Sequence, residues 1–113
     1  MNSTSPQIPL ACNMNVFKPA ERELHIQITN KLFQSLKNIH EAENGYEFSF
    51  PESSEILMSM AKFISNERLC CPFLEFTLKV LPENEVISLL LTGPEGTQEF
   101  LRAEFAEFSE AFV

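Results

Sequence analysis

The chain changes direction at Glu67-Arg68-Leu69-Cys70-Cys71-Pro72-Phe73, and the predicted fold follows from this turn. Pro72 disfavours helical torsions at Cys71, so the preceding helix ends there and an extended segment begins. Neighbouring Cα atoms lie about 3.8 Å apart, less than the roughly 4.4 Å at which ordinary disulfides begin, so a Cys70–Cys71 bond would be strained. The adjacent thiols are therefore not expected to bond to each other.

The segment before this turn is predicted to contain a strand and a long helix. Apolar and polar residues alternate over residues 8–16, which is typical of a half-buried strand and turns Cys12 inward. A helix is predicted over residues 19–43, because Pro19 suits a first helical position and Gly45 is a stop signal. Its apolar stripe consists of Leu24, Ile28, Leu32, Leu36 and Ile39.

The remaining predicted elements are, in order, a strand over residues 46–50, a helix over 55–69 capped by Ser53 or Ser54, two strands over 74–80 and 87–91, and a helix from near Pro94. Residues 82–85 join the last two strands as a hairpin. The order β-α-β-α-β-β-α predicts an α+β two-layer sandwich, a four-stranded mixed sheet with helices on one face. Residues 1–7 are expected to be a disordered tail and 8–113 a single domain.

The composition excludes several classes of partner. The 113 residues include 16 Glu, no Asp and eight Lys or Arg, which gives a net charge of -8. This charge repels phosphate backbones and anionic lipid, so we expect neither nucleic acid nor a membrane as a partner. No apolar run reaches the roughly 20 residues of a membrane span and no secretory leader is recognised, which favours a cytoplasmic protein. In that reducing compartment, three cysteines indicate free thiols, metal ligands or redox groups rather than a disulfide framework.

The cysteines and Glu67 are predicted to meet at one site. On a helical wheel of about 100° per residue, Glu67 and Cys71 project into the apolar sector near Met60, with Cys70 at its edge. Cys12 turns inward from the first strand and can join them. Thiolates select soft ions of the Cu(I), Zn(II), Hg(II) and As(III) class. The sequence thus predicts a soft metal or metalloid site formed by Cys12, Cys70 and Cys71, with Glu67 as a fourth ligand or close partner.

A structural role and a reactive role for the cysteines both remain open. Cys12 and Cys71 could be small buried hydrophobes, because free cysteine is among the most buried residue types. Cys70 or Cys71 could instead be the reactive group of an enzyme or redox switch, with Glu67 moving protons. A helix C-terminus and a nearby carboxylate both raise a thiol pKa, whereas a bound cation would deprotonate the thiols. This electrostatic balance favours the metal site over a nucleophilic enzyme.

The histidines and the glycine-containing segment are weaker candidates. His25 and His40 are both assigned to the first helix, but their spacing does not form a two-histidine clamp, and each is predicted at a helix edge or on the surface. Without Asp, no Asp-based triad or metal cluster is available. The segment 92–97 contains two glycines and Glu95. The glycines permit the turn before the last helix, and Glu95 complements the positive end of the helix dipole, so this segment is predicted to shape the fold.

Three segments together resemble a family of small uncharacterised bacterial proteins. They are Leu10-Ala11-Cys12, the stretch from Glu67 to Phe76, and Leu91-Thr92-Gly93-Pro94-Glu95-Gly96 with Glu99-Phe100-Leu101. The resemblance covers nearly the whole chain and implies a shared fold. Cys12, Glu67, Cys70 and Cys71 fall on matching motif positions, which favours a common site.

The aromatic content suggests self-association. The sequence has 11 Phe, and Phe100 falls off the apolar seam of the last helix, which contains Leu101, Phe105, Phe108 and Phe112. A homodimer that buries Phe100, through the last helix or the mixed face of the sheet, is therefore predicted.

Overall fold

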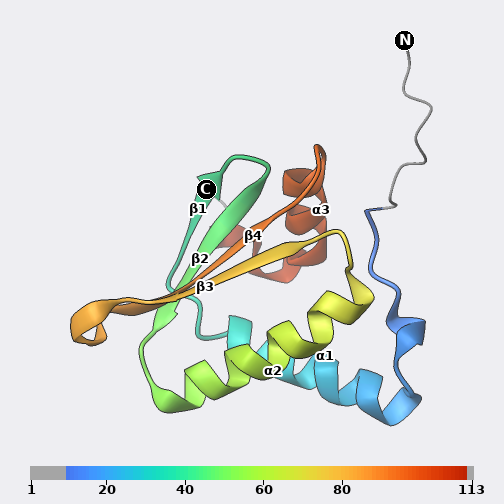
Figure 1. The fold of residues 1–113 in the computed structure, drawn as a ribbon, viewed down its shortest axis with the longest axis horizontal. Coiled ribbons are helices and arrows are strands. Elements are labelled where there is room, and N and C mark those ends of the chain that lie inside the picture. The colour runs from blue at the N-terminus through green and yellow to red at the C-terminus, as the bar shows by residue number, and fades with distance from the viewer. Residues whose placement is uncertain (1–9, 112–113) are drawn as a thin grey trace.

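The computed structural model describes residues 10–111 and shows three α-helices packed on a four-stranded sheet (Figure 1). The α-helices are α1 (Pro19–Phe33), α2 (Ser54–Cys70) and α3 (Thr97–Glu104). The strands are β1 (Asn38–Ala42), β2 (Gly45–Pro51), β3 (Glu75–Val80) and β4 (Val86–Thr92). Three short 3-10 helices are η1 (Met14–Val16), η2 (Pro82–Asn84) and η3 (Ala106–Ala111). The predicted α+β class is confirmed.

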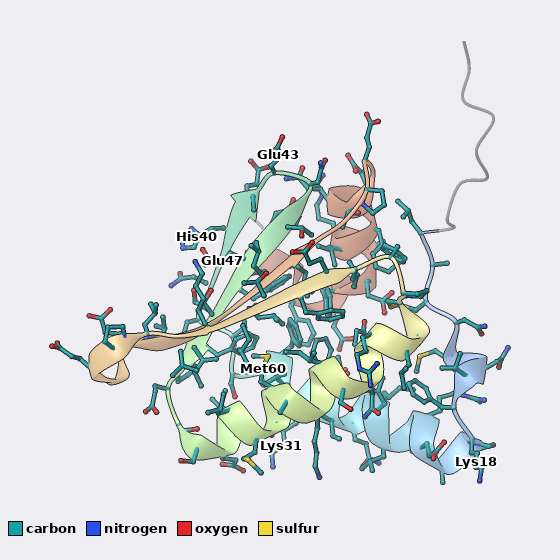
Figure 2. All side chains as sticks on the ribbon, in the orientation of Figure 1. Lys18, Lys31, His40, Glu43, Glu47 and Met60 are labelled. Atoms are coloured by element: carbon teal, nitrogen blue, oxygen red, sulfur yellow. A yellow bond between two sulfur atoms is a disulfide. The ribbon has the colours of Figure 1, made fainter. Side chains whose placement is uncertain are left out.

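The sheet has one apolar and one polar face. Its strand order is β1-β2-β4-β3, and every neighbouring pair is antiparallel. Ile39, Phe48 and Leu89 are aligned across three strands on one face and are buried. His40 and Glu47 are paired on the other face, since successive side chains alternate, and Figure 2 shows them on the side away from α1 and α2. The apolar face is therefore the one that the helices cover.

Aromatic packing joins the helices to that face. Phe33, at the end of α1, contacts Phe48 and Phe50 of β2, with ring centroids 5.4 Å apart in both pairs. It also packs on Phe63 of α2 at 5.5 Å and on Phe105, just after α3, at 4.4 Å. Phe105 in turn reaches Phe48 at 5.7 Å. All three α-helices thus cover one face of the sheet, as predicted.

The predicted strand over residues 8–16 is wrong where the structure describes it. Residues 10–13 form a bend and coil, and Met14–Val16 is a 3-10 helix. The Asn13 side chain accepts a hydrogen bond from the Asn15 N–H at 3.0 Å, a local bond that competes with strand pairing. The observed order is α-β-β-α-β-β-α, and the sheet is antiparallel rather than mixed.

The predicted helix over residues 19–43 is also wrong in its second half. It ends at Phe33, and a hairpin of β1 and β2 follows. Ile39 continues the helical spacing of apolar residues, yet it lies on a strand. Asn44 adopts a φ of 56°, a left-handed conformation that asparagine tolerates, and it directly precedes Gly45. Glu43 and Asn44 form the two-residue turn between the paired residues Ala42 and Gly45, and the helical periodicity concealed this hairpin.

Several predicted boundaries are confirmed or shift slightly. The Ser53 hydroxyl caps α2 by accepting a hydrogen bond from the Ile56 N–H at 3.0 Å. The β3–β4 hairpin turns over residues 82–85, as predicted. The last helix begins at Thr97 rather than near Pro94.

Phe100, on which the predicted homodimer depends, is packed within the monomer on one side. The Phe100 ring is half buried and packs edge-on against Phe73, with centroids 4.8 Å apart.

Phe112 and the predicted disordered tail, residues 1–7, lie outside the described residues. Across residues 10–111, the helices are too short or too polar to cross a bilayer.

Candidate metal and thiol site

The site lies where α2 ends. Cys70 is the last helical residue, and the Cys71 N–H donates to the Glu67 carbonyl at 2.8 Å, which closes the final turn. Cys71 itself leaves helical torsions, with φ −122° and ψ 73°, as expected for a residue before Pro72. The Leu74 N–H then bonds the Cys71 carbonyl at 3.2 Å and directs the chain into β3. This turn fixes two adjacent cysteine side chains in the interior, where both are fully buried.

The third cysteine comes from the segment before η1. The Asn13 N–H donates to the Cys70 carbonyl at 2.7 Å, so one of the free carbonyls at the C-terminus of α2 holds the N-terminal segment in place. This bond brings Cys12 beside Cys71, with their Cα atoms 4.5 Å apart, and the two sulfurs form a disulfide. Cys70 remains a free, buried thiol. The sequence analysis favoured free thiols, metal ligands or redox groups over disulfides, from an odd number of cysteines and an expected reducing compartment, so it did not predict this pairing.

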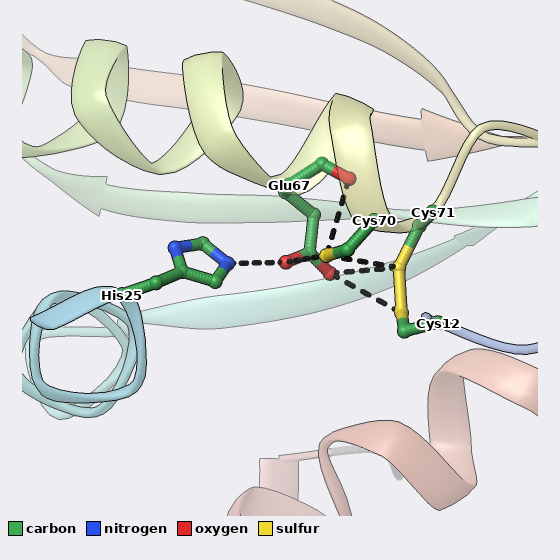
Figure 3. Close-up of a disulfide and its surroundings, with 5 residues drawn as sticks. All are labelled: Cys12, His25, Glu67, Cys70 and Cys71. Atoms are coloured by element: carbon green, nitrogen blue, oxygen red, sulfur yellow. Dashed lines mark hydrogen bonds and ion pairs between the residues drawn. A yellow bond between two sulfur atoms is a disulfide. The ribbon is translucent and has the colours of Figure 1, made fainter. Parts of the chain in front are cut away.

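Four possible ligand atoms converge at this point. One atom each from Cys12, Glu67, Cys70 and Cys71 lies within 4.8 Å of all the others. Figure 3 shows the Glu67 carboxylate and the three sulfurs pointing toward one another from the end of α2 and the N-terminal segment. The Cys70 and Cys71 sulfurs are 3.9 Å apart. The predicted convergence of these four residues is confirmed. Helical phase gave it for Glu67, Cys70 and Cys71, whereas the strand from which Cys12 was predicted to join them is absent.

Glu67 is the polar centre of the cluster. It is 4% exposed, so the prediction that places it inside holds and a solvated position is excluded. Its Oε2 atom lies 3.3 Å from Cys71 Sγ and 3.9 Å from Cys12 Sγ, and its Oε1 atom lies 3.7 Å from Cys70 Sγ. These are hydrogen-bond distances for thiol donors, but a disulfide sulfur has no proton to donate. Oε2 therefore gains two donors only when the disulfide is reduced.

The partner of Glu67 is His25, which sequence reasoning missed. His25 Nε2 lies 2.7 Å from Glu67 Oε1, and the histidine is 2% exposed. Its ring packs between Phe17 and Phe63, at centroid distances of 5.4 and 5.9 Å. The prediction of a helix-edge or surface histidine is wrong for His25. His40 is exposed, as predicted, but it lies on β1 rather than on a helix.

The environment of His25 favours one position for its ring proton. Within residues 10–111, its Nδ1 atom is buried and has no hydrogen-bond partner. A buried N–H without an acceptor is more costly than a bare ring nitrogen, so the proton belongs on Nε2, where it is donated to Glu67.

The surroundings keep the free thiol protonated. Burial raises the pKa of Cys70 from 9.0 to about 12, and the Glu67 charge and its hydrogen bond with the thiol add to this effect. The position at the C-terminal end of α2 acts in the same direction, because the helix dipole is negative there. The arrangement disfavours a nucleophilic thiol and suits a bound cation, which would supply the missing positive charge.

Comparison with known proteins adds no relative. No family model, no curated protein and no solved structure matches this chain.

Proposed function

We propose that the reduced protein binds one soft metal or metalloid ion through the sulfurs of Cys12, Cys70 and Cys71, with the Glu67 carboxylate as a fourth ligand or hydrogen-bonding partner. The observation that carries this proposal is the spacing of the four ligand atoms, all within 4.8 Å of one another. Ligands about 2.3 Å from one ion can be at most roughly 4.6 Å apart. Small side-chain movements are therefore sufficient to coordinate an ion.

The spacing of the adjacent cysteines supports the same ion. Their sulfurs are 3.9 Å apart, close to the roughly 3.8 Å expected for two thiolates on a tetrahedral ion. Thiolate ligands select soft ions such as Cu(I) and Zn(II), and the same chemistry extends to Hg(II) and As(III). The chain thus offers a three-sulfur, one-oxygen ligand set.

Electrostatics also supports a cation. Among the described residues, the nitrogen partner of the buried Glu67 carboxylate is a histidine rather than Lys or Arg. A buried carboxylate needs compensation, and three thiols beside it would lose their protons only to a positive charge. His25 holds the carboxylate oxygen in a fixed direction, as outer hydrogen bonds do at protein metal sites.

The disulfide and the ion exclude each other. Cys12 and Cys71 each contribute a sulfur to both states, and a disulfide sulfur is a poor ligand. The bound state therefore requires a reducing compartment, such as the cytoplasm proposed from the sequence. Oxidation would release the ion.

Titration of the reduced, oxygen-free protein tests this function. Separate additions of Zn(II), Cu(I), Hg(II) and As(III) should show one equivalent bound for at least one ion. The double variant Cys70→Ser/Cys71→Ser should lose this binding. Met58→Ser is the matched control, because it removes a sulfur that is 67% exposed on the same helix. Equal binding by the double variant and by the wild type would contradict the site.

The disulfide favours a second candidate, a thiol redox switch. Two thiols, Cys12 and Cys71, would give up two electrons and two protons to an oxidant of the peroxide class, which is reduced to water or alcohol. The docking of Asn13 on Cys70 places the pair within bonding distance. Peroxide should convert the reduced wild type to the disulfide form with the loss of two hydrogen atoms. The Cys12→Ser variant should form no intramolecular disulfide. A switch without ion binding would leave metal titrations flat in both redox states.

A further inference from the structure

A pocket of about 160 Å³ opens beside the cluster. It lies between α1, the end of α2 and the segment that follows α3. Its lining residues are Met14, His25, Ile26, Thr29, Asn30, Glu67, Glu104, Phe105, Glu107 and Phe108. Glu67 belongs to both the pocket and the cluster, since its Oε2 atom is 3.3 Å from Cys71 Sγ. The pocket therefore brings one residue of the buried site to the wall of a surface opening.

The pocket wall combines negative charge with a soft donor. Glu104 and Glu107 are exposed at its outer side, and Glu67 lies at its inner end. Met14 contributes a half-buried thioether. Partial desolvation and the charge of Glu67 raise the pKa of Glu104, so the two carboxylates repel each other across the pocket. A cation placed between them would relieve this repulsion.

We propose that this pocket is the entrance to the thiol cluster, with Glu104 and Glu107 capturing a soft cation that then passes to Glu67 and the sulfurs. The inference rests on the proposed function and adds to it a faster association for ions that arrive as hydrated cations. Glu104 and Glu107 touch the ion in transit and are absent from the final ligand set.

The charge of the pocket sets a rate preference among soft ligands. A pocket lined by one sign of charge raises the local concentration of opposite charges and speeds their association. Zn(II) arrives as a hydrated cation, whereas arsenous acid is uncharged at neutral pH. Both can bind three thiolates, so only their association rates should respond differently to the acidic wall.

Stopped-flow measurement with the reduced full-length protein tests the proposal. The variant Glu104→Gln/Glu107→Gln should bind Zn(II) with an association rate constant about 3- to 10-fold lower at low salt, and high salt should reduce the difference. Its rate with arsenous acid should equal that of the wild type. Glu83→Gln/Glu85→Gln is the matched control, because it removes the same charge from the turn of the β3–β4 hairpin (Figure 1).

Four outcomes would contradict the proposed capture role of Glu104 and Glu107. An equal loss of rate in the hairpin control would assign the effect to net charge and overturn the capture role. An equal loss with arsenous acid, which is uncharged, would point to a structural effect of the substitutions and would also overturn the capture role. Unchanged Zn(II) association in the pocket variant would also overturn it, while the proposed function would stand. Absence of ion binding in the wild type would overturn both.

A steric variant tests the route independently of charge. Asn30 lines the pocket, whereas Gln27 is exposed on the same helix and does not line it. Asn30→Trp should slow both Zn(II) and arsenous acid by about tenfold or more and leave the final stoichiometry unchanged, because it narrows the proposed route without touching a ligand. Gln27→Trp should leave both rates unchanged. Wild-type rates in Asn30→Trp would show that ions reach the cluster elsewhere.

Discussion

His25 of α1 and Glu67 of α2 form a buried pair, with Nε2 and Oε1 2.7 Å apart, at the inner end of a pocket. The pair connects the two helices and orients the carboxylate toward three sulfurs. The predictions for stability, thiol reactivity and ion binding depend on this pair and on the cysteines beside it.

Removing the histidine should destabilise the fold. His25→Phe keeps a ring between Phe17 and Phe63 but leaves Glu67 without its hydrogen-bond partner. We expect the free energy of unfolding to fall by about 1–3 kcal/mol in urea titrations, the cost of an unpaired buried polar group. His40→Phe, at an exposed position of β1, should change the free energy of unfolding by less than about 0.5 kcal/mol.

A double-variant cycle separates the pair from general packing. Glu67→Leu combined with His25→Phe should cost less than the sum of the single changes, because the second change removes the group that the first left unpaired. Strict additivity of the two losses would contradict a coupled pair.

The free thiol should react slowly at neutral pH. Because burial and the Glu67 charge raise the pKa of Cys70 to about 12, this thiol should be almost entirely protonated at pH 7, and we expect the same direction in the Cys12→Ser/Cys71→Ser variant. The labelling rate with iodoacetamide should rise about tenfold per pH unit from pH 7 to 10, and the unfolded variant should label much faster. Rapid labelling of the folded variant at pH 6 would instead support a catalytic cysteine.

Reduction of the disulfide should lower stability when no ion is present. The Cys12–Cys71 bond joins residues 59 positions apart, so its loss frees a long loop in the unfolded chain. We expect the free energy of unfolding to fall by about 2–4 kcal/mol. Saturating Zn(II) should restore much of this loss in the wild type, since a ligand that binds only the folded state stabilises it. Restoration of the same size in Cys70→Ser would contradict a role of that sulfur.

The close approach of β2 and β4 should make Gly45 intolerant of a side chain. A Cβ atom at this position would lie 1.9 Å from the Leu91 carbonyl oxygen. Gly45→Ala should therefore destabilise the fold by about 1–3 kcal/mol or more in thermal or urea unfolding. Asn44→Gly, in the same turn at a φ of 56°, should be neutral or slightly stabilising, and an equal loss there would point to general sensitivity of the turn.

The sequence was informative where local chemistry and tertiary packing agree. Pro72 set the end of α2, Ser53 its start, and the wheel placed Glu67 inside, as observed. The hairpin of β3 and β4 also followed from alternation and turn residues. In each case the short-range signal and the buried face required the same structure.

The failures occurred where one apolar pattern fits two structures. Apolar residues after Phe33 continue a helical spacing, yet tertiary pairing with β2 made that segment a strand. Leu24 was assigned to the core but is 54% exposed, whereas its neighbour His25 is buried. The signal was present, because His25 lies on the same helical face as Ile28 and Leu32. His25 was left out of the predicted core only because its side chain is polar.

The ligand environment of the reduced protein is the most direct test of the central claim. X-ray absorption at the zinc edge, with one equivalent of Zn(II) bound, should show three sulfurs at about 2.3 Å and one lighter ligand at about 2.0–2.2 Å. In Cys12→Ser the sulfur count should fall to two. A shell of only oxygen and nitrogen in the wild type, or an unchanged sulfur count in Cys12→Ser, would contradict a site built from Cys12, Cys70, Cys71 and Glu67.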